Sequence, residues 1–443
     1  MSGPVETMLP APRGLSVSGF GRMQLRILFL VLLLYVIDGI DTQVLSVAVS
    51  TLAQDWGLPL SSFGTAMAAG YAGSAAGALL GGLLGDRFGR KPTAVGGAVL
   101  FGLATLVMAF LHTPGQLAVI RFIAGLGLGG CLPPVLALLT ETMPKARHGL
   151  VVSFAMLCHP LGISLTGLAG MTILPAFGWQ MLFIVAGLLP IAAAAILLAA
   201  LPESPAYLIR FPGKAKQLED LLRKLDMPAP EPPAADREEG KAGKYRFGLL
   251  FAPGERARVV SLLTAFFFAY LAMTMVLSWL PALLSSAGFS QKVAGTALFI
   301  WSIAGIGGIF FAGLLTGKYG VGRVLRGHLA GGAAALILLA ITLPTPDHGY
   351  PPVYFYGLIA IGGYMLNGTL TSLYALATAS FSSVVRASGI GLSATMGRVG
   401  AILGALTGAQ ALGLLGTQGF FSLVAGSVLL ALAALIAGRR PGL

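Results

Sequence analysis

The feature that most constrains this chain is the recurrence of apolar runs about 20 residues long, separated by short polar turns. The hydrocarbon core of a bilayer is about 30 Å thick, and a helix needs about 20 apolar residues to cross it. The chain is therefore predicted to be an all-α membrane protein with twelve transmembrane helices. The predicted spans are 25–50, 63–85, 93–111, 115–140, 149–171, 180–201, 258–283, 293–316, 322–342, 352–377, 388–413 and 418–438.

Composition and charge placement favour a lipid bilayer over a nucleic acid as the partner. Of the 443 residues, 56% are hydrophobic and 10% are charged, whereas soluble domains carry about 25% charged residues. The net charge is +12, but if the amino terminus is cytoplasmic, Lys292 is the only lysine or arginine in the opposite turns. This asymmetry follows the positive-inside rule. We expect a monomeric, multi-pass protein of a bacterial-type inner membrane with both termini cytoplasmic.

A long polar segment from Pro202 to Arg258 divides the spans into six plus six. The turns Gly82–Pro92 (GLLGDRFGRKP) and Gly313–Arg323 (GLLTGKYGVGR) are similar and follow the second and eighth spans. Duplication of a six-helix unit would leave such turns, as in transporters built from repeats. We predict two pseudo-symmetric six-helix bundles. The predicted parts are a cytoplasmic tail at 1–24, bundles at 25–201 and 258–438, a cytoplasmic linker at 202–257 and a tail at 439–443.

The turn at Gly82–Lys91 matches the pattern G-x-x-x-D-R-x-G-R-[KR]. With the two-half organisation, this turn resembles the major facilitator superfamily, in which the pattern joins the second and third helices. The resemblance implies a conformational latch. Asp86 would accept hydrogen bonds from helix-terminal N–H groups and pair with a basic residue across the two halves. The expected latch residues are Gly82, Asp86, Arg87, Gly89, Arg90, Lys91, Glu141 and Arg386.

Within the superfamily, the first span resembles that of the aromatic acid:proton symporters, which carry D-G-x-D. Here the motif reads Asp38-Gly39-Ile40-Asp41. The resemblance implies a secondary active transporter that imports small aromatic or related carboxylic acids by proton symport with alternating access. Further agreement comes from Arg121 followed by GLGLGG, Glu141, PES at 202–204, Arg386 and Gly397-Arg398.

Asp38 and Asp41 are three residues apart and therefore project from one helix face near the middle of the first span. An ionisable group at that depth is a functional candidate, because inserting it costs at least about 2.5 kcal/mol. Two neighbouring acids in a low dielectric also favour protonation of one of them. We expect Asp38 or Asp41 to carry the coupled proton. The alternative is that both acids brace helices by pairing with Arg121 and Arg398, a set with no net charge.

A guanidinium fork suits a planar carboxylate, so Arg398 is the first candidate for the substrate clamp and Arg121 the second. Arg398 would otherwise brace a helix through one of the aspartates. His159 is a candidate proton relay, or else a packing histidine. Aromatic and amide side chains become a ring site only if they cluster near Arg398. The side chains that could line the site are Tyr35, Tyr270, Trp279, Trp301, Tyr364, Asn367 and Tyr374, and those predicted to bind substrate are Tyr35, Trp279, Tyr364 and Asn367.

Other classes find little support. Gly125, Gly127 and Gly130 match G-x-G-x-x-G, but within an apolar helix, where small residues serve packing. There is no phosphate-binding loop or zinc spacing, and Cys131 and Cys158 lie in apolar spans, so we expect no cofactor, no metal and no enzyme. The remaining alternatives are an exporter, whose fifth-helix signature is absent at 158–162, and a sugar or other neutral-solute porter, suggested by PES.

Overall fold

The computed structural model describes residues 21–225, 250–251, 256–343, 353–381 and 385–438. In this part of the chain, nine helices are long and apolar enough to cross a membrane. Two of them, of 53 and 52 residues, each consist of two helices joined at a glycine. With α12 (Val353–Ser380), the described residues form twelve spanning segments, which confirms the predicted fold class. Residues 1–20, 226–249, 252–255 and 439–443 of the predicted tails and linker lie outside the described residues.

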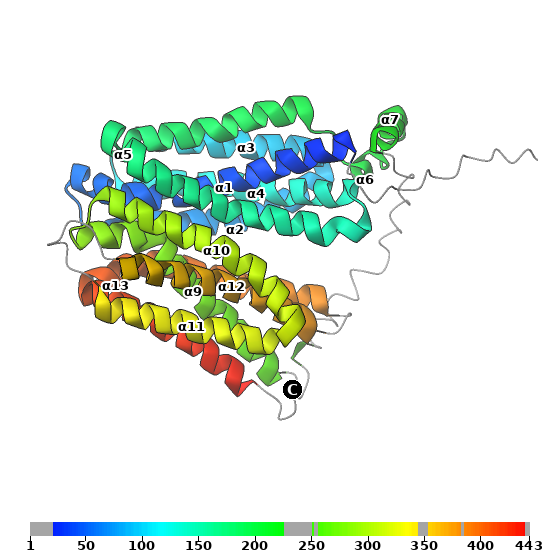
Figure 1. The fold of residues 1–443 in the computed structure, drawn as a ribbon. Helices are drawn as coiled ribbons and strands as arrows, with labels where there is room; N and C mark the ends of the chain where they lie inside the picture. The colour runs from blue at the N-terminus through cyan, green and yellow to red at the C-terminus, as the bar shows by residue number, and fades with distance from the viewer. Residues whose placement is uncertain (1–20, 226–249, 252–255, 344–352, 382–384, 439–443) are drawn as a thin grey trace, which may run out of the picture.

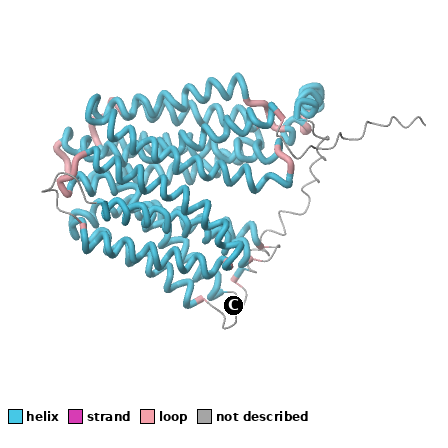
Figure 2. The backbone as a smooth tube through the Cα atoms, in the orientation of Figure 1, coloured by secondary structure: helices cyan, strands magenta, loops and turns pink. Residues whose placement is uncertain are grey.

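The spanning helices form two bundles, shown one above the other in Figure 1. Figure 2 shows helices and loops, with no strand in the described part of the chain. The first bundle contains α1 (Arg22–Trp56), α2 (Gly64–Phe88), α3 (Arg90–Met108), α4 (Pro114–Thr142) and α5 (His148–Ala200). The second contains α9 (Arg256–Ser286), α10 (Gln291–Tyr319), α11 (Val321–Thr342), α12 and α13 (Arg386–Ala437). Short helices α6 (Pro205–Leu208) and α7 (Ala215–Leu225) begin the linker.

Glycines with positive φ occupy equivalent places in the two bundles. Gly89 (φ 110°) separates α2 from α3, and Gly320 (φ 83°) separates α10 from α11. Gly178 (φ 79°) divides α5, and Gly416 (φ 66°) divides α13. Residues with a Cβ are strained in this region of φ, so glycine is the favoured residue at each turn. The matched turns give both bundles the same order of helices.

The outward surfaces of the bundles are apolar. Large hydrophobic side chains stand well exposed along the helices, among them Leu79, Phe110, Ile341 and Leu414. Contiguous apolar surface of this kind is unusual on a soluble monomer. In a bilayer these side chains would contact lipid tails, in agreement with the hydropathy of the spans.

Helices within a bundle approach most closely where one of them carries glycine. A Cβ added to Gly73 would lie 2.1 Å from the carbonyl oxygen of Phe122, and one on Gly129 would lie 2.1 Å from that of Ser74. These contacts join α2 to α4. The glycine run of the fourth span therefore serves helix packing, as small residues commonly do in membranes.

The two bundles touch mainly at one end. We call the end at which α5 finishes and α9 begins the linker end, and the opposite end the far end. Ser46 Oγ in α1 donates to the carbonyl oxygens of Leu277 and Ser278 in α9, both at 2.8 Å. Gly167 and Gly295 cross on α5 and α10, where a Cβ on either would lie within 2.8 Å of the other's carbonyl oxygen. Towards the linker end the ribbons of the two bundles diverge (Figure 1).

Candidate functional site

Asp41 of α1 forms a buried ion pair inside the first bundle. Its Oδ2 lies 2.8 Å from Nη1 of Arg121 in α4, and its Oδ1 accepts a hydrogen bond from Thr105 Oγ1 at 2.8 Å. Arg121 Nη2 also donates to the carbonyl oxygen of Asp41 at 2.8 Å. Gly70 of α2 leaves room for the guanidinium, because a Cβ there would lie 3.0 Å from Arg121 Nε. In this conformation Arg121 is paired with Asp41. This arrangement is the alternative in which the aspartate braces two helices and does not carry the proton.

Asp38 pairs with a histidine instead of an arginine. Its Oδ2 lies 2.8 Å from Nδ1 of His159 in α5. The helices meet closely because Gly39 and Gly162 face each other, and a Cβ on either would lie 2.0 Å from a carbonyl oxygen of the other helix. The side chains of Asp38 and His159 are 13% and 33% exposed, against 2% for Asp41. The more accessible of the two aspartates therefore has a partner that can itself take up a proton.

Arg398 of α13 is an exposed cation in the middle of a spanning helix. Among the described residues it has no hydrogen bond or ion pair, so neither aspartate is its partner. Its guanidinium lies within electrostatic range of the Tyr270 hydroxyl. The ring of Tyr270 packs against the neighbouring Gly397, where a Cβ would lie 2.7 Å from a ring carbon. An arginine at this depth without a counter-charge is a candidate binding group for an anion.

Three aromatic rings, two on α9 and one on α12, gather near Arg398. Phe266 and Tyr270 stack with centroids 6.3 Å apart, and Tyr374 of α12 meets Phe266 edge-on at 5.2 Å. The hydroxyls of Tyr270 and Tyr374 lie 3.2 Å apart. Tyr374 is 36% exposed, whereas Phe266 is fully buried and supports both tyrosines. This is an aromatic cluster next to Arg398, the arrangement required for an aromatic-ring site.

The polar groups of the two bundles lie at one depth. Asp38, His159 and Arg398 are each 18 or 19 residues before the glycine that ends or divides their helix at the far end, namely Gly57, Gly178 and Gly416. At 1.5 Å per residue this is about 27–29 Å along the helix. The accessible acid of the first bundle and the unpaired cation of the second therefore lie at the same level.

Two residues predicted to line the site are buried packing groups. Trp279 is fully buried, and its Nε1 donates to the carbonyl oxygen of Ala405 at 2.9 Å. The amide of Asn367 donates to the Gly363 carbonyl oxygen one turn earlier at 2.8 Å. It packs on Gly305, where a Cβ would lie 2.4 Å from Asn367 Nδ2. These contacts hold α9 to α13 and α12 to α10, away from the aromatic cluster.

Of the two predicted tyrosines, Tyr364 lies away from the site and Tyr35 lies next to Asp38. Tyr364 stacks on His328 of α11 with centroids 5.9 Å apart, so it packs inside the second bundle. Tyr35 is 6% exposed and lies one turn before Asp38 in α1. Only Tyr35 is therefore close to a charged residue of the site.

Tyr71 of α2 is a site residue that the sequence analysis missed. Its hydroxyl lies at Ser278 of α9, across the bundle boundary, and within electrostatic range of Asp38 and Arg121. Gln43 of α1 was likewise not singled out, although it is fully buried and its amide has no hydrogen-bond partner among the described residues. The available signal was a polar side chain in the middle of a span.

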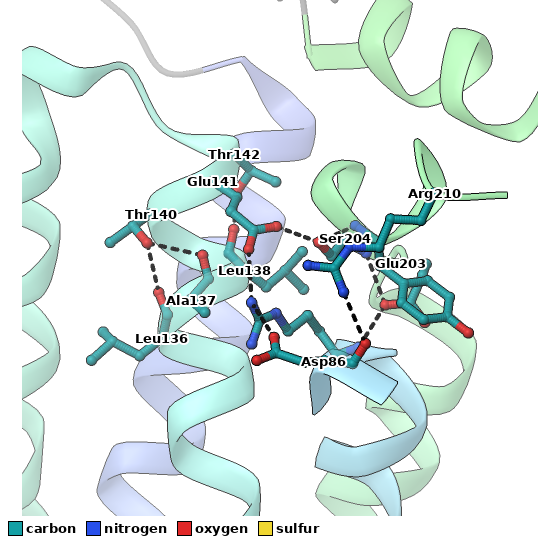
Figure 3. A network of polar contacts seen from close by, with 12 residues as sticks. Asp86, Leu136, Ala137, Leu138, Thr140, Glu141, Thr142, Glu203, Ser204 and Arg210 are labelled. Carbon is teal, nitrogen blue, oxygen red and sulfur yellow. Dashed lines mark hydrogen bonds and ion pairs between the residues drawn. The ribbon is translucent and has the colours of Figure 1, made fainter. Parts of the chain in front are cut away.

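A second polar network lies at the linker end of the first bundle (Figure 3). Arg90 Nη2 lies 3.0 Å from Asp86 Oδ1 and 3.3 Å from Glu141 Oε1. Ser204 Oγ donates to the other oxygen of Glu141. The network joins α2, α3, α4 and the start of the linker. Asp86 thus pairs with Arg90, and among the described residues it forms no pair with a basic residue of the second half.

Glu203, another residue that the sequence analysis did not single out, takes the position expected for Asp86. Its Oε1 accepts hydrogen bonds from the backbone N–H groups of Arg90 at 2.8 Å and Lys91 at 3.2 Å, the first residues of α3. Gly89 is needed here, because a Cβ would lie 2.5 Å from the carboxylate. A carboxylate at a helix N-terminus satisfies free N–H groups and complements the helix dipole. In this conformation Glu203 therefore caps the first turn of α3, and the part of Asp86 in a latch stays a prediction.

The remaining latch candidates have weaker contacts. The Arg87 guanidinium lies 5.3 Å from the centroid of the Phe88 ring, and Gly82 faces open space. Arg386 at the start of α13 is exposed and donates from Nε to the Phe381 carbonyl oxygen at 3.4 Å. Their part in a latch stays a prediction.

The Glu203 cap can be tested by removing its charge alone. In Glu203→Gln we expect amide hydrogen exchange in the first turn of α3 to be about tenfold faster, because hydrogen bonds from two helix-terminal N–H groups to a carboxylate are weakened. Mass-spectrometric exchange of the purified protein measures it. The control is Glu219→Gln, which removes the same charge from an exposed position in α7. Equal exchange in both variants would contradict the capping role.

Comparison with known proteins agrees with this architecture. A family model described as Major Facilitator Superfamily matches residues 31–351 and 262–443. The gallate transporter of Pseudomonas putida is 30% identical over 411 residues, covering 90% of this chain and 88% of the relative. The 4-hydroxybenzoate transporter PcaK of Pseudomonas aeruginosa is 31% identical over 423 residues, covering 92% and 91%. The inward-open xylose transporter XylE from E. coli has a TM-score of 0.72 at 18% identity, covering 95% and 97%.

Two repeated six-helix bundles with ionisable groups at mid-depth define a membrane transporter, not an enzyme. The chain belongs to the major facilitator superfamily and, within it, to the aromatic acid transporters.

Proposed function

We propose that this protein imports small aromatic carboxylates across a bacterial inner membrane together with protons. The observation that carries the proposal is Arg398, an exposed mid-span cation with no partner in the described part of the chain, next to the rings of Tyr270 and Tyr374. A guanidinium fork binds a carboxylate through two parallel hydrogen bonds, and the rings offer a surface for stacking. Relatives named for gallate, 4-hydroxybenzoate and benzoate support this substrate class.

The proton is assigned to the pair of Asp38 and His159. These groups are 2.8 Å apart and partly exposed, so a proton can enter or leave without disturbing another ion pair. Asp41 is a poorer carrier, because its protonation would leave the buried Arg121 without a counter-charge, which is strongly destabilising. Between the two aspartates that the sequence leaves open, the contacts favour Asp38 with His159 as its relay.

The linker end is assigned to the cytoplasm. Basic residues such as Arg22, Arg90, Arg210 and Arg323 lie at this end of the described helices, as the positive-inside rule requires. With this orientation both termini are cytoplasmic. The bundles touch at the far end and diverge towards the cytoplasm (Figure 1), so the conformation is inward-facing.

Transport then follows by rocking of the two bundles about the central site. Outside, a proton joins Asp38–His159 and a carboxylate pairs with Arg398, so each bundle loses an uncompensated charge before the site closes. In the inward-facing state the proton and the carboxylate are released to the cytoplasm. In that state the two bundles are in contact at the far end, at Ser46 and at Gly167–Gly295. The protein is proposed to act as a monomer, since each chain holds both halves of the site.

Uptake by purified protein in proteoliposomes tests this function. With an imposed inward proton gradient we expect labelled 4-hydroxybenzoate to accumulate, and a protonophore to abolish accumulation. Unlabelled benzoate and gallate should compete, and xylose should not. Competition by xylose alone would support a neutral-solute porter, and accumulation that ignores the protonophore would contradict symport.

A further inference from the structure

Tyr270 and Tyr374 hold their hydroxyls together at a fixed place in the second bundle. The two oxygens are 3.2 Å apart, with Tyr270 on α9 and Tyr374 on α12. Phe266, fully buried, packs face-on against Tyr270 and edge-on against Tyr374. Gly397 allows the Tyr270 ring to rest on α13, since a Cβ would lie 2.7 Å from it. The ring positions are therefore set by packing before any ligand arrives.

A hydrogen-bonded pair of phenols still has one unused O–H donor. Each hydroxyl has a single proton, so one donates to the other oxygen and the second proton remains free. Tyr374 is the more accessible of the two, at 36% exposure. The guanidinium of Arg398 lies within electrostatic range of the Tyr270 hydroxyl, and among the described residues no carboxylate pairs with Arg398. A free phenolic donor and an unpaired guanidinium thus point to one anionic ligand.

We propose that the Tyr270–Tyr374 pair and Arg398 form a single receptor for the substrate carboxylate, with Tyr374 as its specificity-determining donor. This inference rests on the proposed function, in which Arg398 binds the carboxylate. Arg398 pairs with the carboxylate through its fork, and the Tyr374 hydroxyl donates a further hydrogen bond to one of the same oxygens. Tyr270 polarises and positions the Tyr374 hydroxyl. The second bundle thus binds the carboxylate of the substrate, and the substituents on the substrate ring point away from these tyrosines.

The proposal differs from the obvious alternative, in which the tyrosines read a ring hydroxyl. If they bind the carboxylate, Tyr374→Phe weakens every aromatic acid by a similar factor. If they bind a ring hydroxyl, the same variant weakens 4-hydroxybenzoate and leaves benzoate unchanged. The two acids differ only at the para position, so their ratio separates the two arrangements.

The test measures the half-saturation concentrations of benzoate and 4-hydroxybenzoate in counterflow exchange by the full chain in proteoliposomes. We expect Tyr374→Phe to raise both by about ten- to a hundredfold, the effect of losing one hydrogen bond to a charged group. The maximal exchange rate should be retained. Tyr270→Phe should raise both by a smaller factor, because Tyr374 keeps its donor and loses only its positioning.

The matched control is Tyr354→Phe on the same helix. It also removes one phenolic hydrogen bond, a 3.0 Å contact to the Thr342 carbonyl oxygen, but at the far end of α12. Its half-saturation values should equal those of the wild type. Stabilisation of the detergent-solubilised protein by added benzoate gives a second readout that does not need transport and shows that each variant is folded.

An unchanged half-saturation for both acids in Tyr374→Phe, or a change for 4-hydroxybenzoate alone, would overturn the proposal. Either result would leave the proposed function intact as long as Arg398 variants lose binding. If the proposed function itself were wrong, the result would be different: aromatic acids would still bind after Arg398 is replaced.

Discussion

Arg398→Gln is expected to abolish transport and to weaken binding of aromatic acids by more than about a hundredfold. The guanidinium is the one group of the proposed site that carries a positive charge and has no protein partner in the described part of the chain. Removing one member of a close charge pair typically costs about 2–5 kcal/mol. Glutamine keeps a polar, uncharged side chain that is shorter than arginine, so the substitution removes the charge and the fork together. Counterflow exchange and ligand-induced thermal stabilisation measure transport and binding separately.

Two further variants make this result specific. Arg398→Lys keeps the charge but not the fork and should retain part of the affinity. Arg323→Gln makes the same chemical change at an exposed linker-end position, where the side chain contacts only the carbonyl oxygen of Tyr319 among the described residues. It should bind and transport like the wild type. Binding by Arg398→Gln within threefold of the wild type would remove Arg398 from the substrate site.

Asp38→Asn is expected to uncouple transport from protons. Asparagine can still hydrogen-bond to His159 at the same place, but it cannot carry the proton. Gradient-driven accumulation should therefore fall to the level of protonophore-treated vesicles, while exchange of labelled for unlabelled substrate continues within a few-fold of the wild type. Accumulation and exchange are measured in the same proteoliposomes. Full accumulation by this variant would exclude Asp38 from coupling.

Asp41→Asn provides the contrast, because it makes the same chemical change as Asp38→Asn at a position three residues further along α1. It leaves Arg121 buried at 6% exposure without a counter-charge, next to Thr105 and Gly70. Breaking a buried ion pair in this way costs about 3–5 kcal/mol. We expect Asp41→Asn to be less stable in detergent and to lose exchange as well as accumulation. If it accumulates less but exchanges normally, the proton belongs to Asp41.

The D-G-x-D motif predicted the positions of the two aspartates but not their partners. It indicated two carboxylates on one face of the first span, and both are there. Residues three apart on a helix are nevertheless turned by about 60° from each other, enough for Asp41 to meet α4 and Asp38 to meet α5. The glycine between them matters because α5 crosses at that point, at Gly162. Nothing in the motif itself reveals that neighbour.

In the Gly82–Lys91 turn at the linker end, likewise, the motif predicted a local contact but not the contact with a distant residue. Its pattern placed Asp86 and Arg90 together, and they do form an ion pair. The carboxylate that caps α3, however, comes from Glu203, more than a hundred residues later. The PES segment, which contains Glu203, was noted only as a further agreement with the family, without a role. The contact of Glu203 with Gly89 depends on how the end of α5 packs beside the turn.

Hydropathy, glycine turns and motif spacing are local properties of the chain, so they predicted the all-helical membrane fold, the twelve spans and the two repeated bundles, and the resemblance of the motifs to a family predicted the transporter class. The tertiary structure alone decided which charges are paired, that Arg121 belongs to Asp41 and that Arg398 stands free beside Tyr270 and Tyr374. The physical reason is that an ion pair or an aromatic contact depends on distances of a few ångströms between helices far apart in sequence. Those distances are set by glycine-mediated packing between helix faces, which no single span encodes.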